Sequence, residues 1–102
     1  MAFVNKRLYK GTLAATEGTL YTVPAGKEAL IKAVTICNIT DADELVTLKF
    51  GDLEIVSEHL IMARDTITIP FWDQILTAAE TIKGTASEAS AINVLISGKE
   101  EA

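Results

Sequence analysis

Residues 45–52 read Leu45-Val46-Thr47-Leu48-Lys49-Phe50-Gly51-Asp52 and contain the clearest structural signal in the chain. Successive side chains of a β-strand point to opposite faces, so Val46, Leu48 and Phe50 would share one face, and the residues between them would share the other. Gly51 and Asp52 are turn formers that reverse the chain into a strand with weaker alternation over residues 53–56. The segment predicts an antiparallel pair with one buried and one solvated face.

Working back towards the N-terminus, residues 19–23 also alternate as a strand. They run into Pro24-Ala25-Gly26-Lys27, where proline presets φ and glycine can take a positive φ. We therefore predict a hairpin between residues 19–23 and a long strand over residues 29–40. Apolar residues fall on both faces of this long strand, which is either central and covered on both sides or bulged near Lys32-Ala33. We predict the bulge.

Three more strands are predicted towards the C-terminus, over residues 66–71, 81–85 and 91–97. Pro70 confines the end of the first to a sheet edge or to a position that is not needed as a donor, because proline cannot donate a ladder hydrogen bond. Gly98 is expected to end the last strand. Residues 59–64 are too few to fix a period and are predicted as a loop, and turns are predicted over residues 77–80 and 86–90.

This pattern predicts an all-β protein with no convincing helix. A chain of 102 residues has room for one hydrophobic core. We expect a single antiparallel β-sandwich, of the jelly-roll or immunoglobulin-like type, with about seven or eight short strands. Residues 1–12 are predicted as an N-terminal arm, 13–98 as the sandwich and 99–102 as a charged tail.

Composition narrows the classes of function. The chain is 49% hydrophobic with a mean hydropathy of +0.29, but its apolar runs are far shorter than the roughly 20 residues that span a bilayer. Its N-terminus lacks the order of charge and apolar residues found in secretory signals, so we expect synthesis in the cytoplasm without secretion. The net charge of −5 argues against nucleic-acid binding, and the small basic cluster of Lys6, Arg7 and Lys10 is interpreted as a solvated arm.

Residues that could support catalysis or metal binding are few. One His and one Cys give no ligand spacing, and a catalytic pair of Cys37 with His59 is a weaker alternative to a packed thiol and a loop imidazole. The glycosylation sequon at residues 38–40 is interpreted as chance, and the acidic pairs at 41/43 and 100/101 as solubilising charge. We expect no enzyme activity, no metal and no cofactor.

The stretch from residue 60 to residue 76 contains more apolar residues than alternating strands need. Phe71 and Trp72 are adjacent, so one ring is expected in the core and the other is a candidate contact for a partner chain or a sugar. A large exposed apolar patch usually marks an interface. We predict a closed homo-oligomer whose contact draws on Leu60, Ile61, Met62, Phe71, Trp72 and Ile75.

Four segments carry a resemblance to a known group: residues 7–13, 19–27, 31–38 and 75–98. They include the Tyr-Thr-Val-Pro-Ala-Gly-Lys turn and the final strand ending in Ser-Gly. Together they resemble the small β-sandwich virion structural proteins of tailed bacteriophages and prophages. That group commonly has an Ala-Gly-Asp turn where this chain has Ala78-Ala79-Glu80. The resemblance implies a homo-oligomer, possibly a trimer, that sits on capsids or in tails and fibres.

The resulting hypothesis is a non-enzymatic virion component, a capsid decoration or head-associated protein, with a tail or fibre component as the alternative. The expected partners are further copies of the chain and other virion proteins such as a major capsid or tail protein, with no nucleic acid and no membrane. A hypothesis from another class is a carbohydrate-binding module that uses Trp72 and Phe71.

Overall fold

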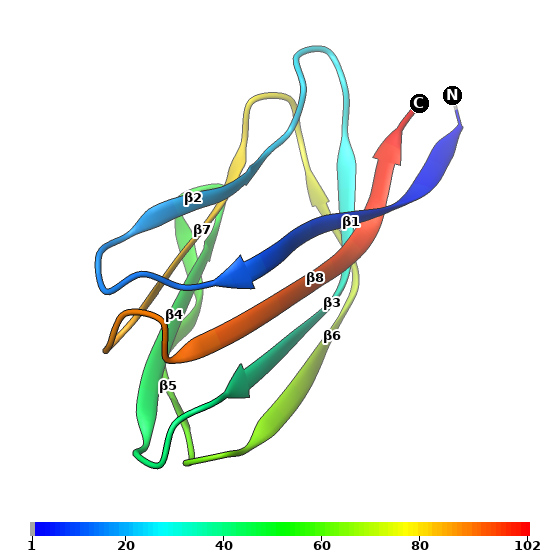
Figure 1. Cartoon of the computed structure of the whole chain (residues 1–102). Coiled ribbons are helices and arrows are strands. Elements are labelled where there is room, and N and C mark those ends of the chain that lie inside the picture. Colours follow the sequence, from blue (N-terminus) through cyan, green and yellow to red (C-terminus); the bar gives the residue numbers. More distant parts are fainter. Residues whose placement is uncertain (1) are drawn as a thin grey trace.

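The computed structural model describes residues 2–102, and these form eight β-strands and no helix (Figure 1). The strands are β1 (Phe3–Thr12), β2 (Gly18–Thr22), β3 (Ala29–Asn38), β4 (Glu44–Phe50), β5 (Leu53–Ile61), β6 (Thr66–Leu76), β7 (Thr81–Ala86) and β8 (Ile92–Glu101).

The strands form two antiparallel sheets of four. Sheet A has the order β1-β8-β3-β6 and sheet B the order β2-β7-β4-β5 (Figure 1). Only β4 and β5 follow one another within the same sheet; each of the other connections crosses from one sheet to the other. This is the strand order of a jelly roll, in which eight strands wind as two Greek keys. The predicted β-sandwich is therefore confirmed, with the jelly-roll topology of the two types considered.

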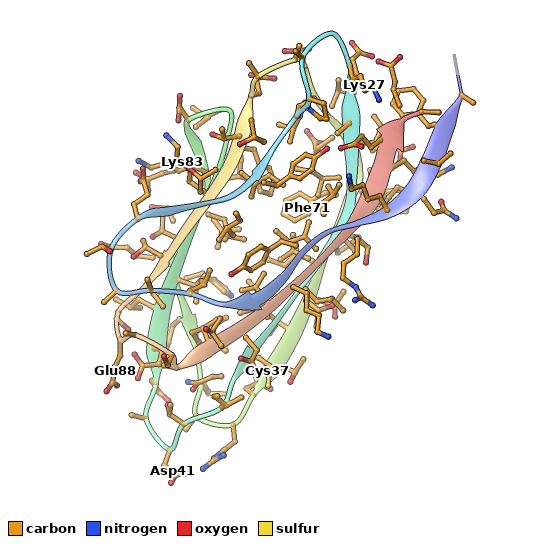
Figure 2. All side chains as sticks on the ribbon, turned by 45° about the horizontal axis from the view of Figure 1, so that its top comes forward. Lys27, Cys37, Asp41, Phe71, Lys83 and Glu88 are labelled. Carbon is orange, nitrogen blue, oxygen red and sulfur yellow. The ribbon has the colours of Figure 1, made fainter. Side chains whose placement is uncertain are left out.

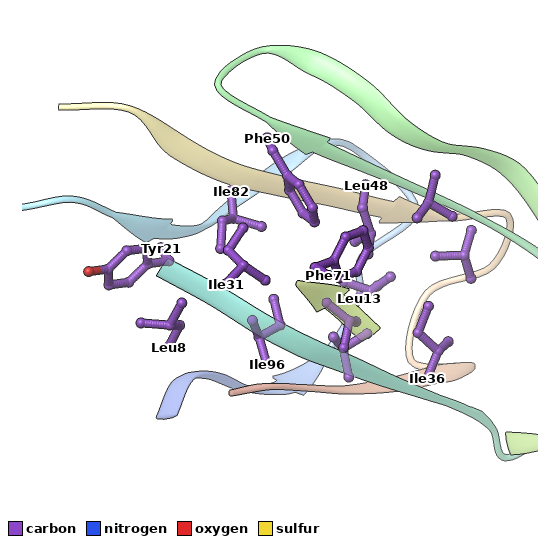
Figure 3. Packing of buried hydrophobic residues seen from close by; sticks show 14 of the residues in the cluster. Leu8, Leu13, Tyr21, Ile31, Ile36, Leu48, Phe50, Phe71, Ile82 and Ile96 are labelled. Atoms are coloured by element: carbon purple, nitrogen blue, oxygen red, sulfur yellow. The ribbon is translucent and has the colours of Figure 1, made fainter. Parts of the chain in front are cut away.

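The core fills the space between the sheets. In β4, Val46, Leu48 and Phe50 are buried as the alternation predicts. The Phe50 ring meets the Phe71 ring of sheet A edge to face, with centroids 5.0 Å apart (Figure 3). Burying a side chain of this size contributes about 1.5–3 kcal/mol, so this central layer is a main source of stability.

The bulge predicted near Lys32-Ala33 is present. The register of β3 shifts between Ile31 and Ala33 against both of its neighbours, β8 and β6. The shift keeps Ile31 and Val34 both facing the core, although an ideal strand would place them on opposite faces. The apolar residues on both faces of the ideal pleat are thereby explained.

The hairpin predicted between residues 19–23 and 29–40 is wrong. β2 pairs with β7 in sheet B, whereas β3 lies in sheet A. Alternation identifies a strand but not its partner. After β2, Val23 donates to the Glu80 carbonyl (3.0 Å) and accepts from the Ala79 amide (3.1 Å), which fastens the chain to the turn before β7.

The predicted loop over residues 59–64 is wrong in its first half, because β5 continues to Ile61. Two register shifts interrupt β5, opposite Val46/Leu48 and Leu48/Lys49, and Glu58 adopts a positive φ of 43°. These bulges scramble the period of two, so the strand has no recognisable sequence pattern. The turn itself covers residues 62–65.

Both chain ends belong to the sandwich. Residues 1–12 were predicted as an N-terminal arm, but residues 3–12 form β1, which pairs with β8 from Phe3↔Glu101 to Thr12↔Asn93. Met1 lies outside the described residues. Gly98 does not end β8. The strand continues to Glu101, through most of the predicted tail, and Glu100 and Glu101 are buried.

Candidate interaction site

Two edge strands from different sheets, β5 and β6, lie on the same side of the sandwich. β1 and β2 are the first strands of their sheets and contact each other, so the last strands, β6 and β5, share the opposite side. The Phe50–Phe71 contact closes the core just beneath it. We call the segment from Leu53 to Leu76, which contains β5, β6 and their turn, the β5–β6 side.

Exposed apolar residues concentrate on the β5–β6 side. Ten large hydrophobic side chains are exposed in the described chain, and six belong to these 24 residues. The six are Leu53, Ile55, Leu60, Met62, Trp72 and Ile75. Scattered exposed apolar residues are ordinary, whereas six of them along one segment of 24 residues make this segment the candidate for an interaction surface.

Trp72 is the most exposed of the six, at 87%, because it occupies a bulge in β6. Three residues, 71–73, lie opposite the single residue Lys32, and Trp72 and Asp73 have φ values of 36° and 61°. The bulge is held by an ion pair of 2.7 Å between Lys32 Nζ and Asp73 Oδ1. Phe71 turns inward and is 8% exposed, so the two rings part as their adjacent positions predict.

The edges of this side are protected against strand addition. Pro70 cannot donate a hydrogen bond, and the Trp72 bulge interrupts the edge of β6. The two register shifts do the same for β5. A partner on this side would therefore be held by side-chain contacts rather than by an added strand.

The six residues predicted as an interface divide into two groups. Ile61 and Phe71 are 1% and 8% exposed and belong to the core, so they cannot contact a partner of the folded chain. Leu60, Met62, Trp72 and Ile75 are exposed. Leu53 and Ile55 were missed, because the bulges in β5 hide the alternation that would have identified them as outward residues.

Hydrogen bonds fix the turn that presents Met62. The Ala63 amide donates to Asp43 Oδ1 (2.9 Å), and Arg64 Nε donates to Asp41 Oδ1 (2.9 Å). The bond from Arg64 lowers the pKa of the Asp41 carboxyl. Figure 2 shows Asp41 at the end of the molecule away from the chain termini. Turn 62–65 is thus tied to the loop between β3 and β4.

The remaining candidates do not form a catalytic site together. Cys37 lies on the outer face of sheet A, opposite Asn93 and Thr66, whereas His59 lies on β5 of sheet B. Asn38, the sequon asparagine, is fully buried, and its amide donates to the carbonyls of Ala42 (2.7 Å) and Ile61 (3.0 Å). Its side chain is inaccessible to modification in the folded protein.

Within residues 2–102, no group of three or more His, Cys, Asp or Glu side chains is placed to hold a metal ion. No helix among these residues is long and apolar enough to cross a membrane.

Comparison with known proteins gives no relative. No family model matches the chain, and neither a curated protein nor a solved structure matches it.

Proposed function

We propose that this protein is a non-enzymatic structural component of a phage virion, a capsid decoration or head-associated subunit that acts through protein contacts. The observation that carries the proposal is the concentration of six exposed apolar side chains on the β5–β6 side. The phage setting rests on the sequence resemblance. Jelly rolls also serve as capsid domains, which is an analogy of fold.

The energy available on the β5–β6 side suits a homo-oligomer. Burying the exposed parts of the six side chains would contribute on the order of 5–10 kcal/mol. Association costs roughly 4–15 kcal/mol in lost freedom, so this side alone supports a modest affinity. A closed ring, in which contacts add around the symmetry axis, makes the best use of such a surface.

The particle assignment is tested by immunogold electron microscopy. Antibody against the purified protein would be applied to particles released from a host that carries the gene. Gold on the heads supports the proposal. Gold on tails or fibres would replace the head assignment with the tail alternative, and unlabelled particles would overturn the virion proposal.

Carbohydrate binding remains a second candidate because of one observation. Trp72 lines a hollow of about 220 Å³ with Pro70, Lys32 and Asp73, and an exposed ring beside polar groups is a common sugar platform. A glycan array is the test, with Trp72→Ala as the binding-defective variant and Ile75→Ala as the control on the same strand. A hit that is lost only with Trp72→Ala would favour this function over the first.

A further inference from the structure

The outer face of sheet A has an electrostatic character unlike the rest of the molecule. We call it the basic face and define it by the outward side chains from Asn93 to Lys99 of β8 and by their neighbours on β1, β3 and β6. Its cations are Arg7, Lys10, Lys32 and Lys99. Its one carboxylate is Asp73, because Glu101 at the strand end turns to accept from the Glu28 amide at 2.7 Å.

This face reverses the charge of the protein. Four cations and one carboxylate give the basic face a formal charge of +3. Because the net charge of the chain is −5, the remaining residues together carry a charge of −8. The basic face is therefore a local positive surface on a strongly acidic molecule, and such a surface attracts negatively charged partners.

The cations of the basic face are also largely without ion-pair partners. Five of the nine Lys and Arg residues form ion pairs: Lys6, Lys32, Lys49, Arg64 and Lys83. Among the described residues, the four without such a pair are Lys27, Arg7, Lys10 and Lys99. Three of these four stand on the basic face.

The three unpaired cations form a ladder along β8. Lys10 lies beside Leu95, Arg7 lies beside Ser97, and Lys99 follows on β8 itself. They therefore mark every second residue of the strand, a repeat of about 7 Å. The side chains on one face of any extended peptide repeat at the same interval.

Two hollows run along this ladder. One, of about 370 Å³, is lined by Lys10, Thr35, Cys37, Asn93 and Leu95, and Figure 2 labels Cys37 within this part of sheet A. The other, of about 400 Å³, is lined by Asn5, Arg7, Lys32 and Ser97. Both lie on β1, β8 and β3, and they follow one another along β8, the first beside Asn93 and Leu95 and the second beside Ser97. We call the two hollows together the furrow.

We propose that the basic face binds an extended segment of a partner protein in which acidic residues occupy alternate positions. The acidic side chains meet Lys10, Arg7 and Lys99, and the backbone lies in the furrow. The proposed contacts are made by β1, β8 and β3, and this surface shares only its β6 margin with the β5–β6 side. The inference therefore does not rest on the proposed function.

The lining of the furrow favours a peptide over a nucleic acid or a sugar. None of the described residues that line the two hollows is aromatic, so bases and sugar rings have no stacking platform. Leu95 and Thr35 instead offer apolar and hydroxyl contacts at the centre, with cations at the rim, which is the usual composition of a protein interface.

Fluorescence anisotropy with the whole protein tests the proposal. The probe is a labelled peptide of about twelve residues that alternates Glu with Thr, and the control peptide contains the same residues in two blocks. We expect the alternating peptide to bind at least about tenfold more tightly at low salt. Arg7→Gln, Lys10→Gln or Lys99→Gln should each weaken it roughly two- to fivefold. Lys27→Gln, which changes the net charge equally, should leave it unchanged.

The single thiol reports where the peptide lies. Cys37 lines the furrow, so saturating peptide should slow its reaction with iodoacetamide at least about threefold. Equal binding of the two peptides, equal weakening by Lys27→Gln, or an unprotected Cys37 would overturn the proposal. Tighter binding of oligothymidylate than of the alternating peptide would also overturn it. So would loss of self-association in the Arg7→Gln, Lys10→Gln and Lys99→Gln variants, because the basic face would then be a contact between copies of this chain.

Discussion

Tyr21 of β2 and Glu100 of β8 join the two sheets across the sandwich: the tyrosine hydroxyl donates a hydrogen bond to the Glu100 carboxylate. Lys6 of β1 forms an ion pair with the second oxygen of that carboxylate, at 3.0 Å. Tyr21 is buried beside Leu8 in the core (Figure 3). This network explains why residues 99–101 continue as a strand instead of leaving the fold as a solvated tail.

Removing the hydroxyl of Tyr21 should destabilise the protein. Hydrogen bonds to charged groups contribute about 1.5–3 kcal/mol, so Tyr21→Phe should lower the free energy of unfolding by about that amount. The control is Tyr9→Phe, because the Tyr9 hydroxyl donates only to the exposed Thr12 carbonyl. Urea denaturation at neutral pH measures both, and equal losses in the two variants would count against the inter-sheet bond.

The same pair predicts a pH dependence. The bond from Tyr21, followed by Lys6, lowers the pKa of Glu100, so its stabilisation is present above pH 5 and is lost as pH falls through its lowered pKa. Burial and then Glu100 raise the pKa of Tyr21 above its ordinary value near 10, so its stabilisation is lost in alkali above that value. The stability difference between the wild type and Tyr21→Phe should therefore shrink at both extremes. A difference that stays constant from pH 3 to pH 11 would contradict this assignment.

The turn before β7 stores backbone strain in Ala79. Its φ is 68°, a region that costs residues with a Cβ about 1–2 kcal/mol. Ala79→Gly should stabilise the fold by about 0.5–1 kcal/mol after the entropy of the added glycine is subtracted. Ala78→Gly, at a residue without a positive φ, should destabilise it instead. Thermal unfolding distinguishes the two variants. A lower Tm for both Ala79→Gly and Ala78→Gly would show that Ala79 is not strained.

Gly98 is required for a close approach between strands. A Cβ at this position would lie 2.1 Å from the Leu30 carbonyl oxygen, and backbone cannot yield as a side chain can. Gly98→Ala should cost about 3 kcal/mol or prevent folding, whereas Gly18→Ala, with no atom within 4 Å of its Cβ, should be close to neutral. The expression level and melting temperature of the two variants give the answer.

The contrast at Gly98 also shows what sequence patterns can predict in this protein. The alternation of Val46, Leu48 and Phe50 predicts its strand correctly because one face is buried and the other is not. A glycine in a strand pattern can indicate either the end of the strand or a close contact with a neighbouring backbone. At Gly98 only the position of Leu30 on the neighbouring strand distinguishes the two. The pairing of β2 with β7 likewise depends on residues about 60 positions apart, which local periodicity does not encode.

The candidate site was predictable only in part for a similar reason. Adjacent Phe71 and Trp72 must point to different sides, so one exposed ring could be expected. The sequence could not show that Ile61 is buried while Leu60 and Met62 are exposed, because a short run of apolar residues does not indicate which of them face the core. Leu53 and Ile55 lie on a bulged strand whose period is broken.

Multi-angle light scattering measures whether the β5–β6 side is an interface between copies of this chain. The purified protein should be measured between about 10 and 200 µM, because a modest affinity is expected. We predict a mass that rises to a fixed multiple of 11.0 kDa, three in the case of a trimer, and that returns to the monomer with Trp72→Ser but not with the control Leu95→Ser on the outer face of sheet A. A mass of 11.0 kDa throughout this concentration range would show that the β5–β6 side is not an interface between copies.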